Sequence, residues 1–558
     1  FSIFFILFGL VSIGTVYVYN DVIKKNYSRP LITGYCLTII TLNALYFLFD
    51  ISFLYSIIIL SVIFFVSFLI NLKKNKYEYL KYLFRIFTLT IAPFIFFGTL
   101  YFFYGEQFYI FRGNKWDWFG LISSSFYLTN IDSNDFLNLS NNLNRESFNN
   151  LSILSKELNP YHFNVFNWLD KMPTLSLLAG LFIKINSSEP FLMGFFFKCL
   201  CFMILNVTIF DFISSLNIKK SFIKNYFLTI VFCFSFWSMY ILEADYARLL
   251  SGFPIFIFLL FNLKDIFKYF NEKNYIMIGI YIFCISTLFL IYPEILFIYF
   301  CLLLVTLFLE KNFFYFFKKN YINIFFSITA VLVLTIPTLN LNFDFFIHQI
   351  KSAQFENRWW TYFGAFIFGS ENPALNNEFA HYVKELIYAS PSAGNHDNLT
   401  LKEIIFIIHH SIEKFNYESI YVNIIPSLFG YYFITNIDFL ENIFYLNYFL
   451  LILFSIYLLI HFFKNCLILF SNNNLLTNHI KSSLIVFIIL SFFFILKGKL
   501  WTEIKLYIYF FPIFASLILL TFKKKNKFKI YPNYFLILIM ILFPIYKFTS
   551  FNNGIGKF

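Results

Sequence analysis

Long apolar runs alternate with short polar loops from one end of the chain to the other. The runs lie near 1–18, 31–49, 51–71, 86–104, 190–213, 225–242, 250–264, 275–292, 295–309, 322–341, 447–463, 483–497, 506–522 and 532–547. Apolar runs of about 18 residues are typical of helices that cross a lipid bilayer. The pattern therefore predicts an all-α polytopic membrane protein with about 14 transmembrane helices.

Two long segments interrupt these runs, and they divide the chain into five parts. The parts are an N-terminal four-span segment (1–104), a first outer loop (105–189), a central six-span segment (190–343), a second outer helical segment (344–446) and a C-terminal four-span segment (447–558). Residues 172–187 are also apolar, but counting them as a span would place the next two Lys-rich loops outside. We therefore expect a re-entrant or interfacial helix there.

The composition agrees with a membrane protein. Hydrophobic residues make up 59% of the chain and charged residues only 13%, whereas a soluble domain carries roughly 25% charged residues. The seven cysteines lie in or beside apolar runs, and none belongs to a cluster with ligand spacing. The cysteines therefore indicate neither a disulfide framework nor a zinc site.

The net charge of +12 reports topology rather than nucleic-acid binding. Basic residues gather in every second short loop, for example in 73–85, 219–224 and 523–529. The positive-inside rule places such loops in the cytoplasm and the two long segments on the opposite face. We expect no nucleic-acid partner. The chain also has no Walker loop, no dinucleotide-binding glycine motif and no nucleophile elbow, which disfavours a nucleotide-driven cytoplasmic reaction.

Asp117 is the first candidate for chemistry. It lies between Trp116 and Trp118, early in the first outer loop. A carboxylate that is partly desolvated by aromatic neighbours becomes more basic, which suits a general base that removes a proton from a hydroxyl group. In the alternative reading, Asn114 is an N-cap and Asp117 is an ordinary acid in the first helical turn.

A second candidate is the short outer turn that contains Glu243, Asp245 and Arg248. The two acids follow the C-terminal end of one predicted span, and the arginine opens the next span. Helix dipoles favour the opposite arrangement, and local rules that are broken together often mark a functional site. The simpler alternative is that Arg248 pairs with one of the two acids across the turn.

Two further charged residues adjoin predicted spans. Glu294 follows Pro293, and this pair is ordinary at the start of a helix, but Glu294 faces the same side as the other candidates. Lys198 lies well inside the run 190–213, where an ionisable group is costly and usually has a partner or a function. Alternatively, its long side chain extends toward the membrane interface.

The late outer loops combine cations with aromatic residues. Arg358 adjoins Trp359 and Trp360, and Lys499 precedes Trp501, Glu503 and Lys505. Arginine and lysine side chains suit the binding of phosphate close to a lipid surface. The same combinations also occur in aromatic belts that anchor a protein in the membrane.

Many spans, an acid in a long outer loop and charged residues at the outer ends of spans together resemble the GT-C superfamily of integral membrane glycosyltransferases. In that superfamily the sugar donor is a polyprenyl phosphate or diphosphate lipid, and the loop acid is the catalytic base or a metal ligand. The resemblance implies that Asp117 is this acid, and it leaves a divalent metal ion open as a cofactor. The chain differs in having four predicted spans before this loop and no second acid adjacent to Asp117.

The expected function is transfer of a sugar from a polyprenyl-phosphate donor to a glycan, lipid or protein acceptor. The reaction would take place on the non-cytoplasmic face of a bacterial inner (plasma) membrane, among membrane lipids, in polysaccharide biosynthesis of the cell envelope. Two alternatives remain. A polysaccharide polymerase or O-antigen-ligase-like enzyme would use outer arginines such as Arg358, whereas a transporter or flippase would need a polar path through the bundle.

Overall fold

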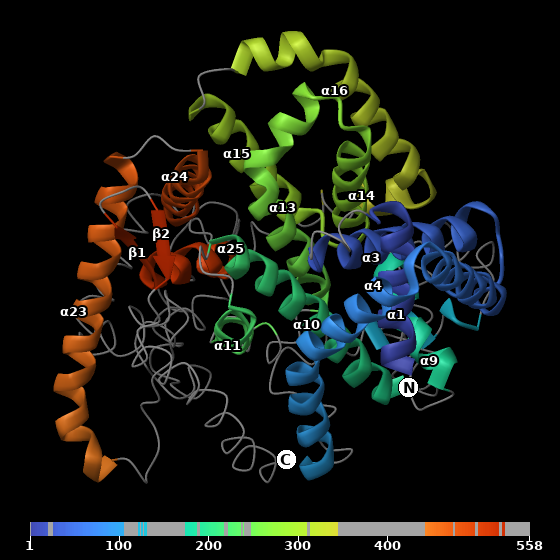
Figure 1. The fold of residues 1–558 in the computed structure, drawn as a ribbon, viewed down its shortest axis with the longest axis horizontal. Helices are drawn as coiled ribbons and strands as arrows, with labels where there is room; N and C mark the ends of the chain where they lie inside the picture. The colour runs from blue at the N-terminus through green and yellow to red at the C-terminus, as the bar shows by residue number, and fades with distance from the viewer. Residues whose placement is uncertain are drawn as a thin grey trace, which may run out of the picture.

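The computed structural model describes the helical parts of the chain. The described residues are 2–19, 26–104, most of 121–130, 173–186, 190–216, 221–235, 247–309, 313–343, 441–471, 475–496, 500–523 and 527–530, with the isolated residues 238, 241 and 347. Figure 1 shows the N-terminal helices on one flank of the molecule, α13 to α16 in the middle and α23 to α25 on the other flank.

The described elements are almost entirely helical, as the sequence predicts. The N-terminal and central elements are α1 (Ser2–Tyr17), α3 (Ser28–Asn43), the π-helix η1 (Ala44–Leu48), α4 (Phe53–Tyr104), α9 (Pro173–Asn186), α10 (Pro190–Leu216), α11 (Phe222–Cys233), α13 (Ala247–Asn271), α14 (Tyr275–Ile291), α15 (Glu294–Leu309), α16 (Phe313–Thr335) and the short η3 (Ile336–Thr338). The C-terminal elements are α23 (Glu441–Ser471), α24 (Leu475–Leu496), α25 (Leu500–Leu519) and an antiparallel hairpin of β1 (Leu520–Lys523) and β2 (Lys527–Ile530).

Several of these helices are suited to a membrane. Within the described residues, four helices are long and apolar enough to cross a bilayer, or five if the bent α13 counts as one span. Eight shorter apolar helices accompany them. The apolar helices indicate a membrane protein, whereas the number of about 14 spans remains a prediction. Helix α9 coincides with the predicted apolar segment 172–187 and is buried in the bundle.

Helix α4 is a hairpin of two arms rather than one straight rod. Asn75 interrupts it with an extended backbone (φ −163°, ψ 93°), and its side-chain oxygen accepts a hydrogen bond from the Glu78 amide at 3.2 Å. This contact caps the start of the second arm in the manner of an N-cap residue. The segment 73–85, expected as a loop, is helical on both sides of this one residue.

Both arms of the hairpin run along α1, as its contacts establish. Close to the break, the Tyr79 hydroxyl lies 2.7 Å from the Ser12 hydroxyl, and Asn71 donates to the Ser12 carbonyl at 2.8 Å. Further from the break, the Phe87 ring of the second arm lies 5.3 Å from the Phe4 ring, and the Phe64 ring of the first arm lies 6.0 Å from the Phe5 ring. Both arms of α4 therefore start from the break at Asn75 and follow α1. They correspond to the two predicted spans 51–71 and 86–104.

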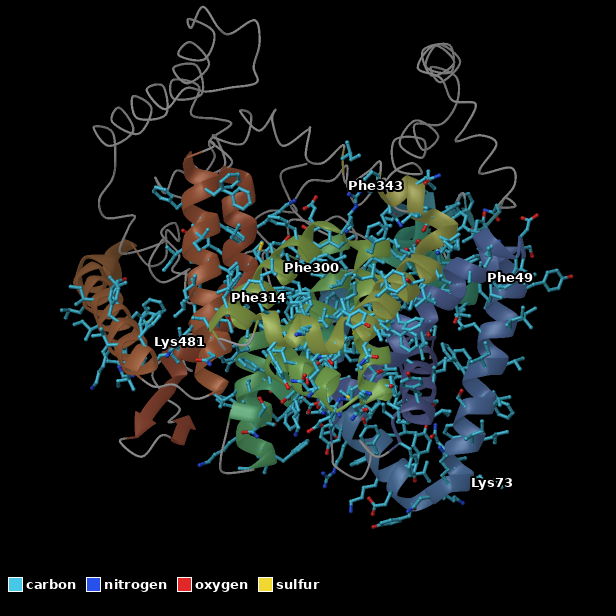
Figure 2. All side chains as sticks on the ribbon, turned by 90° about the horizontal axis from the view of Figure 1, so that it is seen from above. Phe49, Lys73, Phe300, Phe314, Phe343 and Lys481 are labelled. Carbon is cyan, nitrogen blue, oxygen red and sulfur yellow. The ribbon has the colours of Figure 1, made fainter. Side chains whose placement is uncertain are left out.

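Burial separates helices inside the bundle from helices on its surface. Of the residues in the most apolar stretch of α10, 89% are buried, whereas only 11% are buried in the corresponding stretch of Phe314–Phe343, which includes α16. Figure 2 shows Phe314 and Phe343 on this surface helix and Lys73 at the far tip of the α4 hairpin. An exposed apolar face of this length would be unfavourable in water, so α16 is suited to contact lipid.

The two ends of the central helices carry different charged residues. Arg248 lies at the start of α13 and Glu294 at the start of α15, next to the end of α14. Lys268 and Lys273 lie at the opposite end, where α13 ends and α14 begins. The full length of α14 thus separates Lys268 and Lys273 from Arg248 and Glu294.

Candidate functional site

An ion pair joins two helices that are far apart in the sequence. The Lys505 Nζ of α25 lies 3.0 Å from the Glu294 Oε2 of α15, across 211 positions of sequence. The two side chains are 18% and 22% exposed, so they are shielded from most of the solvent but still accessible. Burial of this degree strengthens an ion pair beyond that of a fully exposed pair.

Arg248 adds a second positive charge to this pair. Burial by itself would raise the pKa of Glu294, but the charges of Lys505 and Arg248 and a hydrogen bond from Tyr292 outweigh that effect and hold it below its usual value. Glu294 is the first residue of α15, directly after the turn that joins α14 to α15, and it lies outside the predicted span 295–309. It is therefore ionised at neutral pH and is the shared partner of two cations.

Two tyrosines close one side of this cluster. The Tyr292 and Tyr509 hydroxyl oxygens lie 2.7 Å apart, and both side chains are buried. Gly252 packs so closely on Tyr292 that an added Cβ would lie 3.3 Å from the Tyr292 Cβ. The cluster therefore draws residues from α13, the α14–α15 turn, α15 and α25, and we refer to Arg248, Tyr292, Glu294, Lys505 and Tyr509 as the outer charge cluster.

The chemistry that this cluster offers is recognition of an anion. Two cations against one carboxylate leave one net positive charge (+2 − 1 = +1) among its described side chains. Guanidinium and ammonium groups bind phosphate through charge-assisted hydrogen bonds. Among the described residues, no three His, Cys, Asp or Glu side chains lie close enough to hold a metal ion. Asp117 lies outside the described residues, so its expected role as a metal ligand is untested.

Two of the predicted site residues, Arg248 and Glu294, lie close enough for the charge of Arg248 to act on the Glu294 carboxylate. Lys198 lies in α10 and is only 2% exposed. Whether its side chain extends toward the membrane interface is untested. The remaining predicted residues lie outside the described residues: Asp117, Glu243, Asp245, Arg358 and Lys499. Pairing of Arg248 with Glu243 or Asp245 across the turn is therefore untested.

Sequence reasoning missed the partner of Glu294. The sequence places Lys505 with Lys499 near the lipid surface. In the structure, however, Lys505 lies within α25 and its Nζ reaches Glu294 of α15. Tyr292 and Tyr509 gave no signal, because tyrosine is abundant in this chain and common at membrane interfaces. The one feature that could have indicated a partner for Lys505 is its position as a charged residue just inside an apolar helix.

A second site that the sequence analysis missed lies where α3 begins. No side chain of its own caps α3, but the Asp211 carboxylate of α10 accepts hydrogen bonds from the Tyr27 and Ser28 amides at 2.7 and 2.5 Å. The Arg85 guanidinium of α4 donates to the Tyr27 hydroxyl at 2.8 Å. A carboxylate at a helix N-terminus is favoured by the free amides and the helix dipole. This site therefore ties α3, α4 and α10 together, which is a structural role.

Replacing Asp211 with alanine should lower the free energy of unfolding by about 2 kcal/mol, because two amides would lose an ionised acceptor. The measurement is the midpoint of thermal unfolding of the purified protein in detergent. Glu272→Ala is the matched control, because Glu272 is 54% exposed and pairs only weakly with Lys268 at 3.8 Å. Equal midpoints for the two variants would contradict a role of Asp211 in holding α3.

Comparison of the chain with models of protein families, with curated proteins and with solved structures finds no match. No family is therefore assigned, and the resemblance to GT-C glycosyltransferases rests on the sequence pattern alone.

Proposed function

We propose that the protein transfers a sugar from a polyprenyl-phosphate donor to an acceptor on the non-cytoplasmic face of the membrane. The observation that carries the proposal is the outer charge cluster, with its net positive charge at one end of an apolar helix bundle. A lipid-linked phosphate needs cations at the border of the apolar region, and this cluster offers them there. It lies at the end of α14 opposite Lys268 and Lys273. The positive-inside rule supports placing this end on the non-cytoplasmic face.

In the proposed reaction, the phosphate of the donor lies against Arg248 and Lys505. The acceptor oxygen forms a bond to the anomeric carbon while the bond from that carbon to the phosphate oxygen breaks. The polyprenyl phosphate leaves with the electron pair of the broken bond, and the acceptor proton passes to Asp117. Fixed positive charge at the leaving phosphate lowers the barrier, because that oxygen gains charge in the transition state. Attack from the face opposite the leaving group inverts the configuration of the sugar.

Mass spectrometry of lipids that co-purify with the gently solubilised protein should detect polyprenyl phosphate, with or without a sugar. Replacing Lys505 with glutamine should reduce the retained amount by about tenfold, because one charge-assisted contact to phosphate would be lost. Lys268→Gln is the matched control, because Lys268 is 63% exposed at the opposite end of the helices. Its retention should equal that of the wild type.

Retention of bulk phospholipid alone, even after polyprenyl-phosphate sugar has been added, would contradict the proposed function. Equal losses in the Lys505→Gln and Lys268→Gln variants would show that the lipid responds to overall charge rather than to the outer charge cluster.

A further inference from the structure

Glu294 is the one carboxylate of the outer charge cluster, and two cations act on it. Its oxygen binds Lys505 at 3.0 Å, and the charge of Arg248 also acts on it. In the absence of another anion, this carboxylate neutralises one of the two positive charges. A phosphate that enters the cluster would lie close to the Glu294 carboxylate, and the two anions would compete for the same cations because like charges repel.

An apolar strip leads away from Glu294 along one side of α15. Phe297, Leu304 and Phe308 follow Glu294 by 3, 10 and 14 positions, a spacing that keeps them on one helical face. These three side chains are 52%, 44% and 60% exposed. Glu294 thus lies at the head of a row of three exposed apolar side chains, with Lys505 beside it. This arrangement matches the shape and charge of a long-chain lipid phosphate, whose head is anionic and whose chain is apolar.

We propose that Glu294 is a resident anion that occupies the phosphate position of the outer charge cluster until a long-chain lipid phosphate displaces it. The inference rests on the proposed function and identifies the ligand of that site by its chemistry. The chain of the lipid lies along Phe297, Leu304 and Phe308, and its phosphate takes over Lys505 and Arg248. The displaced carboxylate moves toward solvent, to which it is already 22% exposed.

A displaceable Glu294 and a purely structural ion pair predict opposite effects of removing the Glu294 charge on ligand binding. Replacing Glu294 with glutamine removes the competing charge but keeps the size of the side chain. The variant should therefore bind farnesyl phosphate about tenfold more tightly than the wild type, which is the effect of losing one partly buried competing charge. The measurement is a titration of the intact, detergent-solubilised protein with farnesyl phosphate, followed by native mass spectrometry.

Three controls separate the sources of the effect. Glu272→Gln changes the net charge by the same amount at an exposed position at the other end of the helices, and it should leave the affinity unchanged. Inorganic phosphate should bind more weakly than farnesyl phosphate, because it lacks the chain. Farnesol carries no charge, so its affinity should not respond to Glu294→Gln.

The outcomes distinguish this inference from the proposed function. Weaker or unchanged binding of farnesyl phosphate to Glu294→Gln, with clear binding to the wild type, would overturn the displacement of Glu294 but leave the proposed function standing. Binding to neither protein would contradict both. If Glu294→Gln does not fold, Glu294→Asp retains the charge but shortens the reach to Lys505. It should then bind farnesyl phosphate more tightly than the wild type, and equal or weaker binding would overturn the inference.

Discussion

Replacing Gly34 with alanine is expected to destabilise the N-terminal helices severely. Gly34 of α3 faces the Leu10 carbonyl of α1, and Gly14 of α1 faces the Pro30 carbonyl of α3. A Cβ at either glycine would overlap a backbone oxygen, which cannot rotate away as a flexible side chain can. The two helices would have to separate, at a cost of about 3 kcal/mol or more in the free energy of unfolding. Small residues commonly allow such close crossings between membrane helices.

The measurement for Gly34→Ala is the unfolding midpoint and the yield of monodisperse protein in detergent. Gly98→Ala is the matched control, because Gly98 lies in α4 and nothing would approach an added Cβ there within 4 Å. Alanine is favoured over glycine inside a helix by roughly 0.5–1 kcal/mol, so this control should be neutral or slightly stabilising. A Gly34→Ala protein as stable as the Gly98→Ala protein would contradict the close crossing of α1 and α3.

Replacing Asp117 with asparagine is expected to reduce sugar transfer by about a thousandfold, because the amide cannot accept the proton of the acceptor hydroxyl. General bases contribute roughly 10²–10⁴-fold to such rates. Asp117 lies outside the described residues, so this prediction rests on the sequence and on the proposed function. The measurement is transfer from a polyprenyl-phosphate sugar by the purified protein, with the amounts of variant and wild type matched.

Lipid retention provides the control for this prediction. The Asp117→Asn protein should still retain polyprenyl phosphate, because the proposed phosphate contacts come from the outer charge cluster. Full transfer activity in the variant would remove the assignment of Asp117 as the base. Loss of transfer in Arg358→Gln with normal transfer in Asp117→Asn would favour the polysaccharide polymerase or ligase alternative instead.

Features that depend on neighbouring residues in the chain are the ones that the sequence predicts. Hydrophobic runs predicted helices at α1, α3, α10, α14 and α15, because the apolar residues of a membrane helix are contiguous in the sequence. The segment 73–85, predicted as a loop, is helical in α4 instead. Charged residues alone do not end a helix, and Asn75 interrupts it at a single position.

The order of residues along the chain is enough to indicate a membrane protein, and it places basic residues in loops and charged residues near helix ends. These features depend on composition and on neighbours along the chain. Only the packing of the helices shows that Glu294 pairs with Lys505 and receives the charge of Arg248, and that Asp211 caps α3. Such contacts join helices separated by up to 211 positions, and a single sequence does not specify which helices become neighbours. Helix packing determines those neighbours, because it brings side chains from distant spans to the same end of the bundle.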